Sequence, residues 1–516
     1  MKIIFYNPKS NASGKRILPM SLLALGAVVE GKYDYAIVDG NAVDDPVAAI
    51  REHIRAGASL LAVTVMPGPQ LSQAVSHCRA LKDKFPRLTI VWGGYFPTQH
   101  ADVCFKSPFV DFVVRGHGEL VFRALVDALA TGSDYQGIPG LAFRHQSVIA
   151  SGAKRSPNRE LEIASSPRPL LAMTSVAQNP MAPIPHPEHL PAWPYHRLDM
   201  PQYVRNTFLG SRTLPHHSSY GCPFFCNFCA VVNMVNGRWL PQSAARVAEI
   251  ARMYVEQWGV NAIEFYDNNF FTHEARTADF AERILPLHLA WWGEGRIDTL
   301  LKYSERSWQL MREAGLKMVF MGAESGSAET LKLMDKGGTM SPDKTLEMAA
   351  KMREYGIVPE FSFVLGSPPD PERDVRHTIE FIRRVKRVNP RSEIIMYNYT
   401  PVPLAGDLYD AARAEGFRFP ETLDEWVSND WLEFSQRHSS QMPWLRERLR
   451  QDIRDFERVL NAYYPTTTDA RLTDGWRALL RGVSSWRYAS RVYAFPLELR
   501  ALQKLVHYQR PETSGF

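Results

Sequence analysis

Two series of alternating apolar strands and helices constrain the fold of this chain more than any other feature of its sequence. In the first series, helical patterns at 21–30, 46–56, 71–84 and 119–130 separate short apolar runs at 3–6, 35–38, 60–65, 89–92 and 112–114. Helices between consecutive apolar strands are typical of a parallel sheet that is covered on both faces. The sequence therefore predicts a doubly wound, Rossmann-like α/β domain over residues 1–145.

A second series of the same kind occupies the middle of the chain. Helical patterns such as 243–258 and 275–284 separate strand-like runs at 262–266, 291–297, 317–321, 360–365 and 393–399. Most of these runs end in glycine or polar residues. In a parallel barrel such strand ends meet at the C-terminal rim, where active sites lie. We expect a partial (β/α)6 barrel over residues 206–415, with its site at that rim.

Two segments lie outside these series. Ten prolines between positions 157 and 201 make a continuous helix or strand unfavourable, so we interpret residues 146–205 as a proline-rich linker over the domain junction. Residues 416–516 are rich in Trp and Arg and show helical spacing at 444–460 and 497–507. They predict a mainly helical C-terminal domain with an aromatic core. The alternative is a cap that closes the barrel and helps to select the substrate.

Three cysteines lie close together in the stretch Ser219-Tyr-Gly-Cys-Pro-Phe-Phe-Cys-Asn-Phe-Cys229. Cys222, Cys226 and Cys229 supply three thiolates and no fourth. A closed structural zinc site usually draws four ligands from two separated pairs. An iron–sulfur cluster with three cysteine ligands keeps one iron open for another ligand. The spacing thus favours a [4Fe–4S] cluster, and the alternative is a zinc site completed by His216 or His217.

The net charge and the cysteine content limit the classes of protein to which this chain can belong. The formal net charge is +5, and the basic residues are spread along the chain, so no nucleic-acid partner is expected. The other two cysteines, Cys78 and Cys104, are isolated and suggest no disulfide framework. The N-terminus resembles a buried strand more than a signal peptide, and no apolar run approaches the ~20 residues of a membrane-spanning helix. We expect a cytoplasmic protein without a transmembrane segment.

The cysteine spacing resembles that of the radical S-adenosylmethionine (SAM) superfamily. In that family the amino and carboxylate groups of SAM chelate the open iron, and an electron from the cluster cleaves SAM to a 5′-deoxyadenosyl radical. The resemblance implies that Cys222, Cys226 and Cys229 are the metal ligands and the catalytic residues. It also implies that Phe228, immediately before the last cysteine, lies against the adenine.

The strand ends of the second series coincide with SAM-contact positions of the same family. The element that begins at Gly322 resembles the family's glycine-rich element, and Asp267-Asn268 resembles an acidic strand end in which Asn268 replaces a second Asp. A guanidinium pairs with a carboxylate in bidentate geometry, so Arg296 is placed to meet the SAM carboxylate. Taken singly, each polar strand end could equally be a helix N-cap. The positions expected to contact SAM are Phe228, Asp267, Asn268, Arg296, Gly322, Ala323, Glu324, Ser325 and Gly366.

The first series resembles the cobalamin-binding domain that precedes many radical SAM domains. Its signatures Gly-Gly-x-x-Pro-Thr and Arg-Gly-x-Gly-Glu occur here at 93–98 and 115–119. Ligands of such folds lie beyond the carboxyl ends of the strands, and glycine lets a backbone approach a bulky ligand. The Asp-x-His-x-x-Gly motif that supplies a lower axial histidine is absent, so we expect no histidine beneath the cobalt. The residues expected near cobalamin are Thr64, Gly68, Gly93, Gly94, Pro97, Thr98, Gly116, His117, Gly118 and Glu119.

These resemblances imply a cobalamin-dependent radical SAM enzyme. Radical C-methylation is the commonest activity of this architecture, so we expect transfer of a methyl group from methylcobalamin to an unactivated carbon. One alternative is a cyclase or ring-rearrangement enzyme without methyl transfer, of the anaerobic magnesium-protoporphyrin ester cyclase type. A second is a corrinoid-binding carrier that has lost catalysis. Methylthiolation is disfavoured because neither cysteines for a further cluster nor an RNA-binding module is evident.

The expected partners are a small-molecule substrate and an electron donor such as flavodoxin or ferredoxin. A lipid, a tetrapyrrole and a natural-product precursor all fit the resemblance, and the sequence does not choose between them. Tyr266, Tyr397, Tyr399 and His438 are polar candidates to face the substrate cavity, with packing or surface exposure as the alternative.

Overall fold

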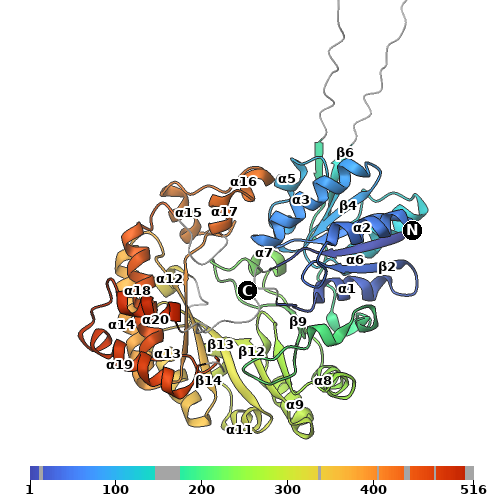
Figure 1. The fold of residues 1–516 in the computed structure, drawn as a ribbon. Coiled ribbons are helices and arrows are strands. Elements are labelled where there is room, and N and C mark those ends of the chain that lie inside the picture. The colour runs from blue at the N-terminus through green and yellow to red at the C-terminus, as the bar shows by residue number, and fades with distance from the viewer. Residues whose placement is uncertain are drawn as a thin grey trace, which may run out of the picture.

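The computed structural model describes residues 1–10, 15–145, 175–334, 339–403, 406–434, 442–469 and 472–505. Three parts follow one another along the chain (Figure 1). An N-terminal α/β domain, drawn in blue, lies above a central barrel drawn in green to yellow. The C-terminal helices, drawn in orange and red, pack along the side of the barrel and reach back to the N-terminal domain.

The N-terminal sheet has the strand order β2-β1-β3-β4-β5-β6-β7. Apolar side chains on both faces of its strands are buried, Ile4 and Tyr6 of β1 against one layer of helices and Ile3 and Phe5 against the other. This confirms the predicted doubly wound domain. The parallel strands are β1 (Lys2–Asn7), β2 (Asp34–Asp39), β3 (Ala58–Thr64), β4 (Thr89–Gly93) and β5 (Phe112–Val114), and the covering helices are α1 (Met20–Val29), α2 (Pro46–Arg55), α3 (Pro69–Lys84), α4 (Tyr95–Gln99), α5 (Ala101–Phe105) and α6 (Glu119–Thr131).

Two antiparallel strands extend this sheet beyond the prediction. β6 (Leu141–His145) pairs with β5, and β7 (Ser175–Gln178) pairs with β6. Residues 175–178 of the segment interpreted as a proline-rich linker therefore form a short strand at the edge of this sheet. Residues 175–178 contain no proline, so their backbone amides are available for pairing at a sheet edge.

The central domain is a six-stranded parallel sheet with the order β15-β14-β13-β12-β11-β8. Residues from alternate positions of its strands, such as Ile263, Phe265 and Trp291, pack against the outer helices. A partial (β/α)6 barrel is confirmed. Its strands are β8 (Thr213–His216), β11 (Ala262–Phe265), β12 (Ala290–Gly295), β13 (Leu316–Glu324), β14 (Val358–Leu365) and β15 (Glu393–Asn398), and its main helices are α8 (Ala244–Trp258), α9 (Glu274–Ile284), α11 (Glu305–Glu313), α13 (Pro342–Tyr355) and α14 (Pro371–Val388).

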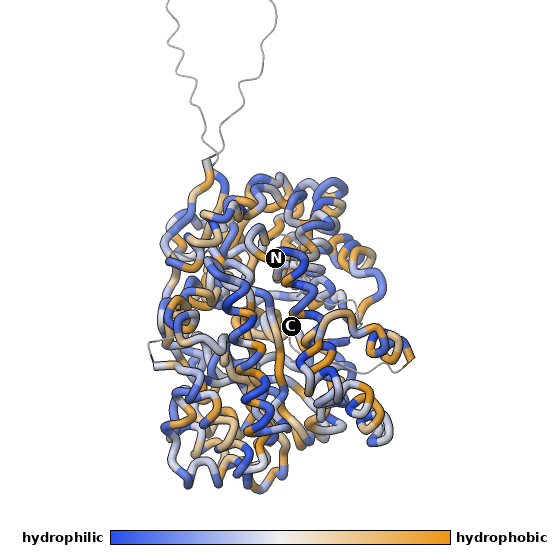
Figure 2. The backbone as a smooth tube through the Cα atoms, turned by 90° about the vertical axis from the view of Figure 1, so that its left-hand side faces the viewer, coloured by the Kyte–Doolittle hydropathy of each residue, from blue (hydrophilic) through white to orange (hydrophobic). Residues whose placement is uncertain are grey.

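Hydrophilic and hydrophobic residues alternate along the helices on the face that Figure 2 shows. In α14 the buried residues Val375, Thr378, Phe381, Ile382 and Val385 recur every three or four positions, which is the spacing of one helix face. Such amphipathic helices cover the barrel strands and leave the C-terminal rim free for a site.

The C-terminal helices contact both other domains. Trp426 packs edge-on against Phe96 of the N-terminal domain with 5.1 Å between ring centroids, and Arg383 of α14 donates to the carbonyl of Tyr488 at 2.6 Å. A mainly helical part is thus confirmed. Its helices are α15 (Asp407–Ala414), α16 (Leu423–Trp426), α17 (Asn429–Phe434), α18 (Glu447–Tyr463), α19 (Asp474–Ser490) and α20 (Leu497–Leu505). No helix in the described residues is long and apolar enough to cross a membrane.

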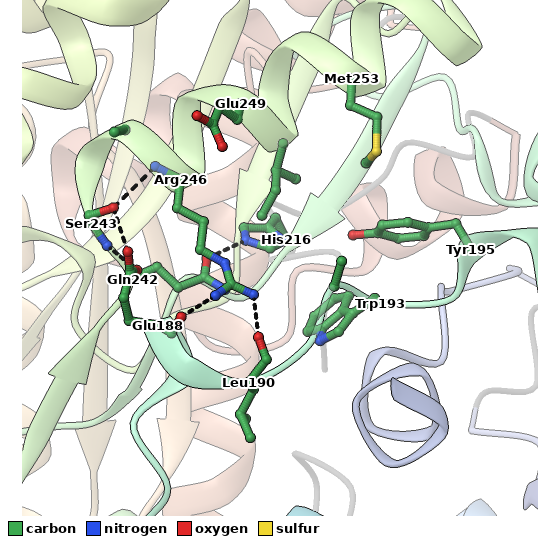
Figure 3. Close-up of a pocket in the computed structure, with 13 residues that line it drawn as sticks. Glu188, Leu190, Trp193, Tyr195, His216, Gln242, Ser243, Arg246, Glu249 and Met253 are labelled. Atoms are coloured by element: carbon green, nitrogen blue, oxygen red, sulfur yellow. Dashed lines mark hydrogen bonds between the residues drawn. The ribbon is translucent and has the colours of Figure 1, made fainter. Parts of the chain in front are cut away.

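The described part of the linker is fastened to the first barrel helix (Figure 3). Ser243 donates its backbone N–H and its hydroxyl to the Glu188 carboxylate at 2.7 and 2.9 Å, and Arg246 donates to the carbonyls of Glu188 and Leu190. A cavity of about 570 Å³ lies between this segment and α8, with Trp193 and His216 among its walls. It lies behind β8, on the outer side of the barrel, and none of the three clustered cysteines lines it.

One buried and two half-buried histidines predict a loss of stability in mild acid. Burial lowers the pKa of His100, His117 and His216 to about 4, whereas an unfolded histidine titrates near pH 6.5. As the pH falls below 6.5 the unfolded chain takes up protons that the folded chain does not. The free energy of unfolding should then fall by up to about 1.4 kcal/mol per pH unit for each histidine until pH 4.

Urea unfolding between pH 7.5 and pH 5 measures this dependence above the range in which most carboxylates titrate. His216→Gln should make the dependence shallower, because it removes one of the three proton sites. His53→Gln, on the half-buried face of α2, serves as the matched control. An equally steep dependence in His216→Gln and the unchanged chain would contradict the prediction.

Candidate functional site

The cysteine loop begins directly after the short strand β9 (Ser219–Gly221) at the rim of the barrel. Gly221 has φ +88°, and a Cβ there would stand 2.1 Å from the carbonyl oxygen of Arg238. The loop is anchored further along by Asn227, whose backbone N–H and side-chain amide donate to the carbonyls of Met334 and Leu333 at 3.2 and 2.6 Å. These contacts fix the backbone that carries the three thiols before helix α7 (Val231–Val235).

The three cysteines of the loop are free thiols. Cys226 is buried, and Cys222 and Cys229 are half-buried. Burial, together with the neighbouring thiols, raises the pKa of Cys222 and raises that of Cys229 to about 12. Metal binding must therefore displace the protons from these thiols. The chemistry of the donor set fits a cluster that takes one thiolate on each of three irons.

The histidines of the zinc alternative do not join the thiols in one group. His216 faces the outer layer of the barrel, where its Nε2 lies 3.0 Å from Gln242 Oε1 and its ring lies near Trp193 and Phe265. Within the described residues no three His, Cys, Asp or Glu side chains are grouped as a single metal ion would require.

The end of β11 supports the cysteine loop from below. Asp267 is fully buried and accepts hydrogen bonds from the Ser218 backbone N–H at 3.1 Å, from the Ser218 hydroxyl at 2.9 Å and from the Ser219 hydroxyl. Asn268 is exposed, whereas Asn269 is fully buried beside Cys222. The Asn269 amide lies against the Cys222 thiol, and within the described chain neither of its polar atoms has another hydrogen-bond partner. Asp267 thus positions the cysteine loop. The family pattern in the sequence did not point to Asn269.

Arg296 lies over the cysteine loop with its charge already paired. Its Nε and Nη2 donate to the two carboxylate oxygens of Asp298 at 2.9 and 3.0 Å, and its Nη1 donates to the Cys226 sulfur at 3.4 Å. The guanidinium carbon stands 3.8 Å from the centre of the Phe224 ring. The carboxylate beside it raises the pKa of Arg296, so the side chain stays cationic at every accessible pH.

The end of β13 carries a kinked backbone at the predicted glycine-rich element. The register with β14 shifts between Gly322 and Glu324, and Glu324 has φ +63°. A non-glycine residue in the left-handed region is uncommon, and such strain collects at functional sites. The Glu324 side chain is buried and its charge acts on Cys229, while Ala323 faces the core. The kink therefore brings the Glu324 carboxylate next to the cysteine loop.

Asp374 of α14 ties two of these strand ends together. It accepts a hydrogen bond from the Ser325 hydroxyl at 2.8 Å and from the backbone N–H groups of Gly366 and Ser367 at 2.9 and 3.3 Å. Ser325 is fully buried by these contacts, so it shapes the turn. Sequence reasoning missed Asp374, whose only local signal is its place in the first turn of a helix that follows a glycine-rich strand end.

The signature loops of the N-terminal domain meet beyond β3, β4 and β5. The Thr98 hydroxyl donates to the Gly94 carbonyl at 2.7 Å and accepts from the Gly116 backbone N–H at 3.0 Å. Gly94 has φ +99°, and a Cβ there would stand 3.1 Å from the Val65 backbone nitrogen. Of the remaining predicted positions, Thr64 and Gly93 end β3 and β4, Gly68 and Gly118 directly precede α3 and α6, and Pro97 lies in α4.

A buried hydrogen bond joins these loops to the cysteine loop. The Tyr220 hydroxyl donates to Glu119 Oε1 at 2.6 Å, and the His117 ring stacks on Tyr220 with 4.4 Å between centroids. Burial raises the pKa of Glu119, and its Oε2 has no hydrogen-bond partner in the described part of the chain. An amide-rich ligand such as cobalamin would supply the missing donor. Tyr220 precedes Cys222 by two residues, so the two predicted cofactor sites adjoin.

An apolar cluster, formed mostly by the C-terminal part together with Met334 and Tyr399 of the barrel, covers the rim. It packs against Phe228 of the cysteine loop and Val364 of β14, and Trp444 donates its indole N–H to the Gly366 carbonyl at 2.9 Å. Gly366 has φ +75°, and a Cβ there would stand 2.6 Å from Leu445. The buried members of this cluster are Met334, Tyr399, Leu408, Ala412, Phe417, Met442, Trp444 and Leu445.

The interior of the barrel carries carboxyl groups between apolar side chains. Glu264 accepts from the Tyr266 hydroxyl at 2.7 Å and pairs with Arg205, and Glu360 accepts from the Trp292 indole at 3.1 Å. Burial and the neighbouring carboxylates of Asp267 and Glu360 raise the pKa of Glu294 to about 8. Of the predicted cavity residues, Tyr397 is half-buried on β15, Tyr399 lies in the rim cluster, and His438 lies outside the described residues.

Two models of protein families match the chain. The model described as the radical SAM superfamily matches residues 217–382, and the B12 binding domain model matches residues 11–126. The first range contains the cysteine loop and the strand ends of the barrel up to Gly366. The second contains the signature loops of the N-terminal domain.

Individual relatives cover most of the chain. An uncharacterized methyltransferase from Pyrococcus horikoshii is 27% identical over 394 residues, which are 75% of this chain and 78% of the relative. An anaerobic magnesium-protoporphyrin IX monomethyl ester cyclase from Synechocystis sp. is 26% identical over 400 residues, which are 75% of this chain and 72% of the relative. The solved structure of the cobalamin-dependent S-adenosylmethionine radical enzyme OxsB with aqua-cobalamin bound has a TM-score of 0.62 and 15% identity, and it covers 98% of this chain and 71% of that chain. That likeness shows a shared fold.

Proposed function

We propose that this chain, a cobalamin-dependent radical SAM enzyme, transfers a methyl group to an unactivated carbon of a small-molecule substrate. The observation that carries the proposal is the hydrogen bond from Tyr220 to Glu119, because it makes the two cofactor sites adjoin. A methyl group can pass from one site to a carbon activated at the other only if both face the same space.

The residues present fit the three cofactors. Cys222, Cys226 and Cys229 would hold the [4Fe–4S] cluster, with Asn269 at its edge. Residues at the strand ends would hold SAM, with Glu324 and the backbone at Gly322 and Gly366 as the nearest groups. The loops around Gly94, Thr98 and Gly116 would hold cobalamin, with Glu119 as a buried acceptor. When bound, the cluster and SAM supply hydrogen abstraction, and cobalamin supplies the methyl group.

The protein itself positions these groups and excludes water. The rim cluster around Trp444 and Leu445 covers the strand ends, so a reactive intermediate would be shielded from solvent. Asp267 and Asp374 hold the loops through buried hydrogen bonds. The interior carboxyl groups, Glu294 above all, offer hydrogen-bonding anchors to a substrate that enters the barrel. A low-potential electron carrier such as flavodoxin or ferredoxin would supply electrons.

The test is an anaerobic incubation of the cluster-reconstituted, cobalamin-loaded protein with SAM, a strong reductant and candidate substrates. Methyl transfer predicts that 5′-deoxyadenosine and S-adenosylhomocysteine accumulate together and that S-adenosylhomocysteine disappears when cobalamin is omitted. Mass spectrometry of both products, with and without cobalamin, measures whether this expectation holds. S-adenosylhomocysteine that forms equally well without cobalamin would overturn the proposal.

A second candidate is cyclisation or rearrangement without methyl transfer, which the similarity to the Synechocystis cyclase favours. This reaction predicts 5′-deoxyadenosine with a substrate-dependent product but without substrate-dependent S-adenosylhomocysteine. The same incubation therefore separates the two candidates.

A further inference from the structure

Arg296 is arranged to act on a cluster ligand. Three of its N–H groups have partners of fixed geometry, two on Asp298 and one on the sulfur of Cys226, which is 70 positions away in the sequence. Arg296 is 6% exposed and Asp298 is 5% exposed. Asp298 also accepts a hydrogen bond from the Thr339 hydroxyl. The guanidinium therefore has little freedom to turn toward another ligand.

The other neighbours of the guanidinium fix its plane. Phe224, two residues before Cys226, lies against it at 3.8 Å, and a cation over an aromatic face is favourable when both are desolvated. The two hydrogen bonds to Asp298 fix one edge of the guanidinium, and the Phe224 ring covers one of its faces. Nη1 is therefore directed at the Cys226 sulfur. The side chain is thus held in this position by contacts within the protein.

A hydrogen bond from a cation to a thiolate ligand changes the energy of a cluster. One-electron reduction adds a negative charge to the cluster and its sulfurs. A nearby positive charge and an N–H···S bond stabilise that reduced form more than the oxidised form, and both raise the reduction potential. The effect is strong where water is excluded, because the local dielectric constant is low.

We propose that Arg296 sets the reduction potential of the [4Fe–4S] cluster through the Cys226 sulfur, with Asp298 and Phe224 as its supports. This role replaces the contact with the SAM carboxylate that the sequence predicts. Arg296 is then a positioning residue that eases delivery of the electron used in SAM cleavage. The proposal rests on the cluster of the proposed function and is independent of whether methyl transfer follows.

An EPR-monitored redox titration tests the proposal on the full, cluster-reconstituted and cobalamin-loaded chain without SAM or substrate. Dithionite serves as the one-electron reductant. Arg296→Gln removes the charge and should shift the cluster to a more negative potential. Arg296→Lys keeps the positive charge but lacks the two N–H groups that bind Asp298 side by side, so its shift in reduction potential should be smaller. Arg283→Gln is the matched control, because it removes the same charge from an exposed pair with Asp279 on α9.

Iron content and the EPR line shape of each variant show whether the cluster has assembled. An unchanged potential in Arg296→Gln, with a complete cluster, would overturn the proposal. The dissociation constant for SAM is measured on the same samples. If Arg296→Gln binds SAM tenfold more weakly while its reduction potential is unchanged, Arg296 contacts the SAM carboxylate, as the sequence predicts. Neither result depends on methyl transfer, so failure of this proposal is distinguishable from failure of the proposed function.

Discussion

Replacing Cys226 with alanine is expected to remove the cluster and to reduce 5′-deoxyadenosine formation to the level found without protein. The loop offers only three thiols, and two thiolates cannot hold three irons of a cubane. Cys226 is also the most buried of the three, so no surface residue can take its place. Iron and sulfide content, the absorbance of the cluster and product formation together measure the effect.

Cobalamin binding should survive this substitution, since its predicted loops follow strands of the N-terminal sheet and meet the cysteine segment at Tyr220, with Tyr95 near Cys229. Cys104→Ala is the matched control, because Cys104 is equally a free thiol but lies fully buried in the N-terminal core. It should keep the cluster. A full complement of iron in Cys226→Ala would show that the assignment of the ligands is wrong.

Replacing Gly221 with alanine is expected to disturb the cysteine loop without touching a ligand. The added Cβ would lie 2.1 Å from the Arg238 carbonyl oxygen, a backbone atom that is held in the hairpin of β9 with β10 (Trp239–Pro241). The left-handed φ of +88° costs about 1–3 kcal/mol for a residue with a side chain, and relief of the clash must move the backbone one residue before Cys222. We expect a large loss of bound iron at a modest fall in melting temperature.

The control for Gly221→Ala is Gly356→Ala at the end of α13. Gly356 also has a positive φ, +67°, but nothing lies within 4 Å of a Cβ built there. This variant should show the conformational strain alone, with its iron content unchanged. Equal losses of iron in the two variants would refute a local effect on the loop.

Local patterns were enough to predict much of the architecture. The alternation of strand and helix patterns predicted β5 with the bounds that the structure shows. Most other predicted elements lie within a few residues of the observed ones. The antiparallel strands β6 and β7 and the short helices α4 and α5 were missed, because short elements at an edge carry too few residues for a period to show. The helix predicted from Trp444 begins at Glu447, since Trp444 and Leu445 serve as anchors on Gly366.

The candidate site was predictable where the residues that define its chemistry lie close together in the sequence. The three thiols of the cysteine loop and the glycines of the signature loops lie within short stretches of sequence, so their spacing alone indicates what they bind. Residue-by-residue matching was less reliable at the strand ends. Asn268 stands where the family pattern has a second Asp but is exposed, while its neighbour Asn269 is buried beside Cys222.

The sequence by itself determined the two α/β series, the cysteine cluster and the glycine-rich strand ends, because each is a local pattern of residue types. Only the tertiary structure decided which groups meet. Arg296 reaches Cys226, Asp374 joins two strand ends, and Tyr220 reaches Glu119 across the domain junction. The physical reason is that periodicity reveals which face of an element is buried. The partner of a polar group on that face depends on how distant elements pack, and hydrogen bonds form only within about 3 Å.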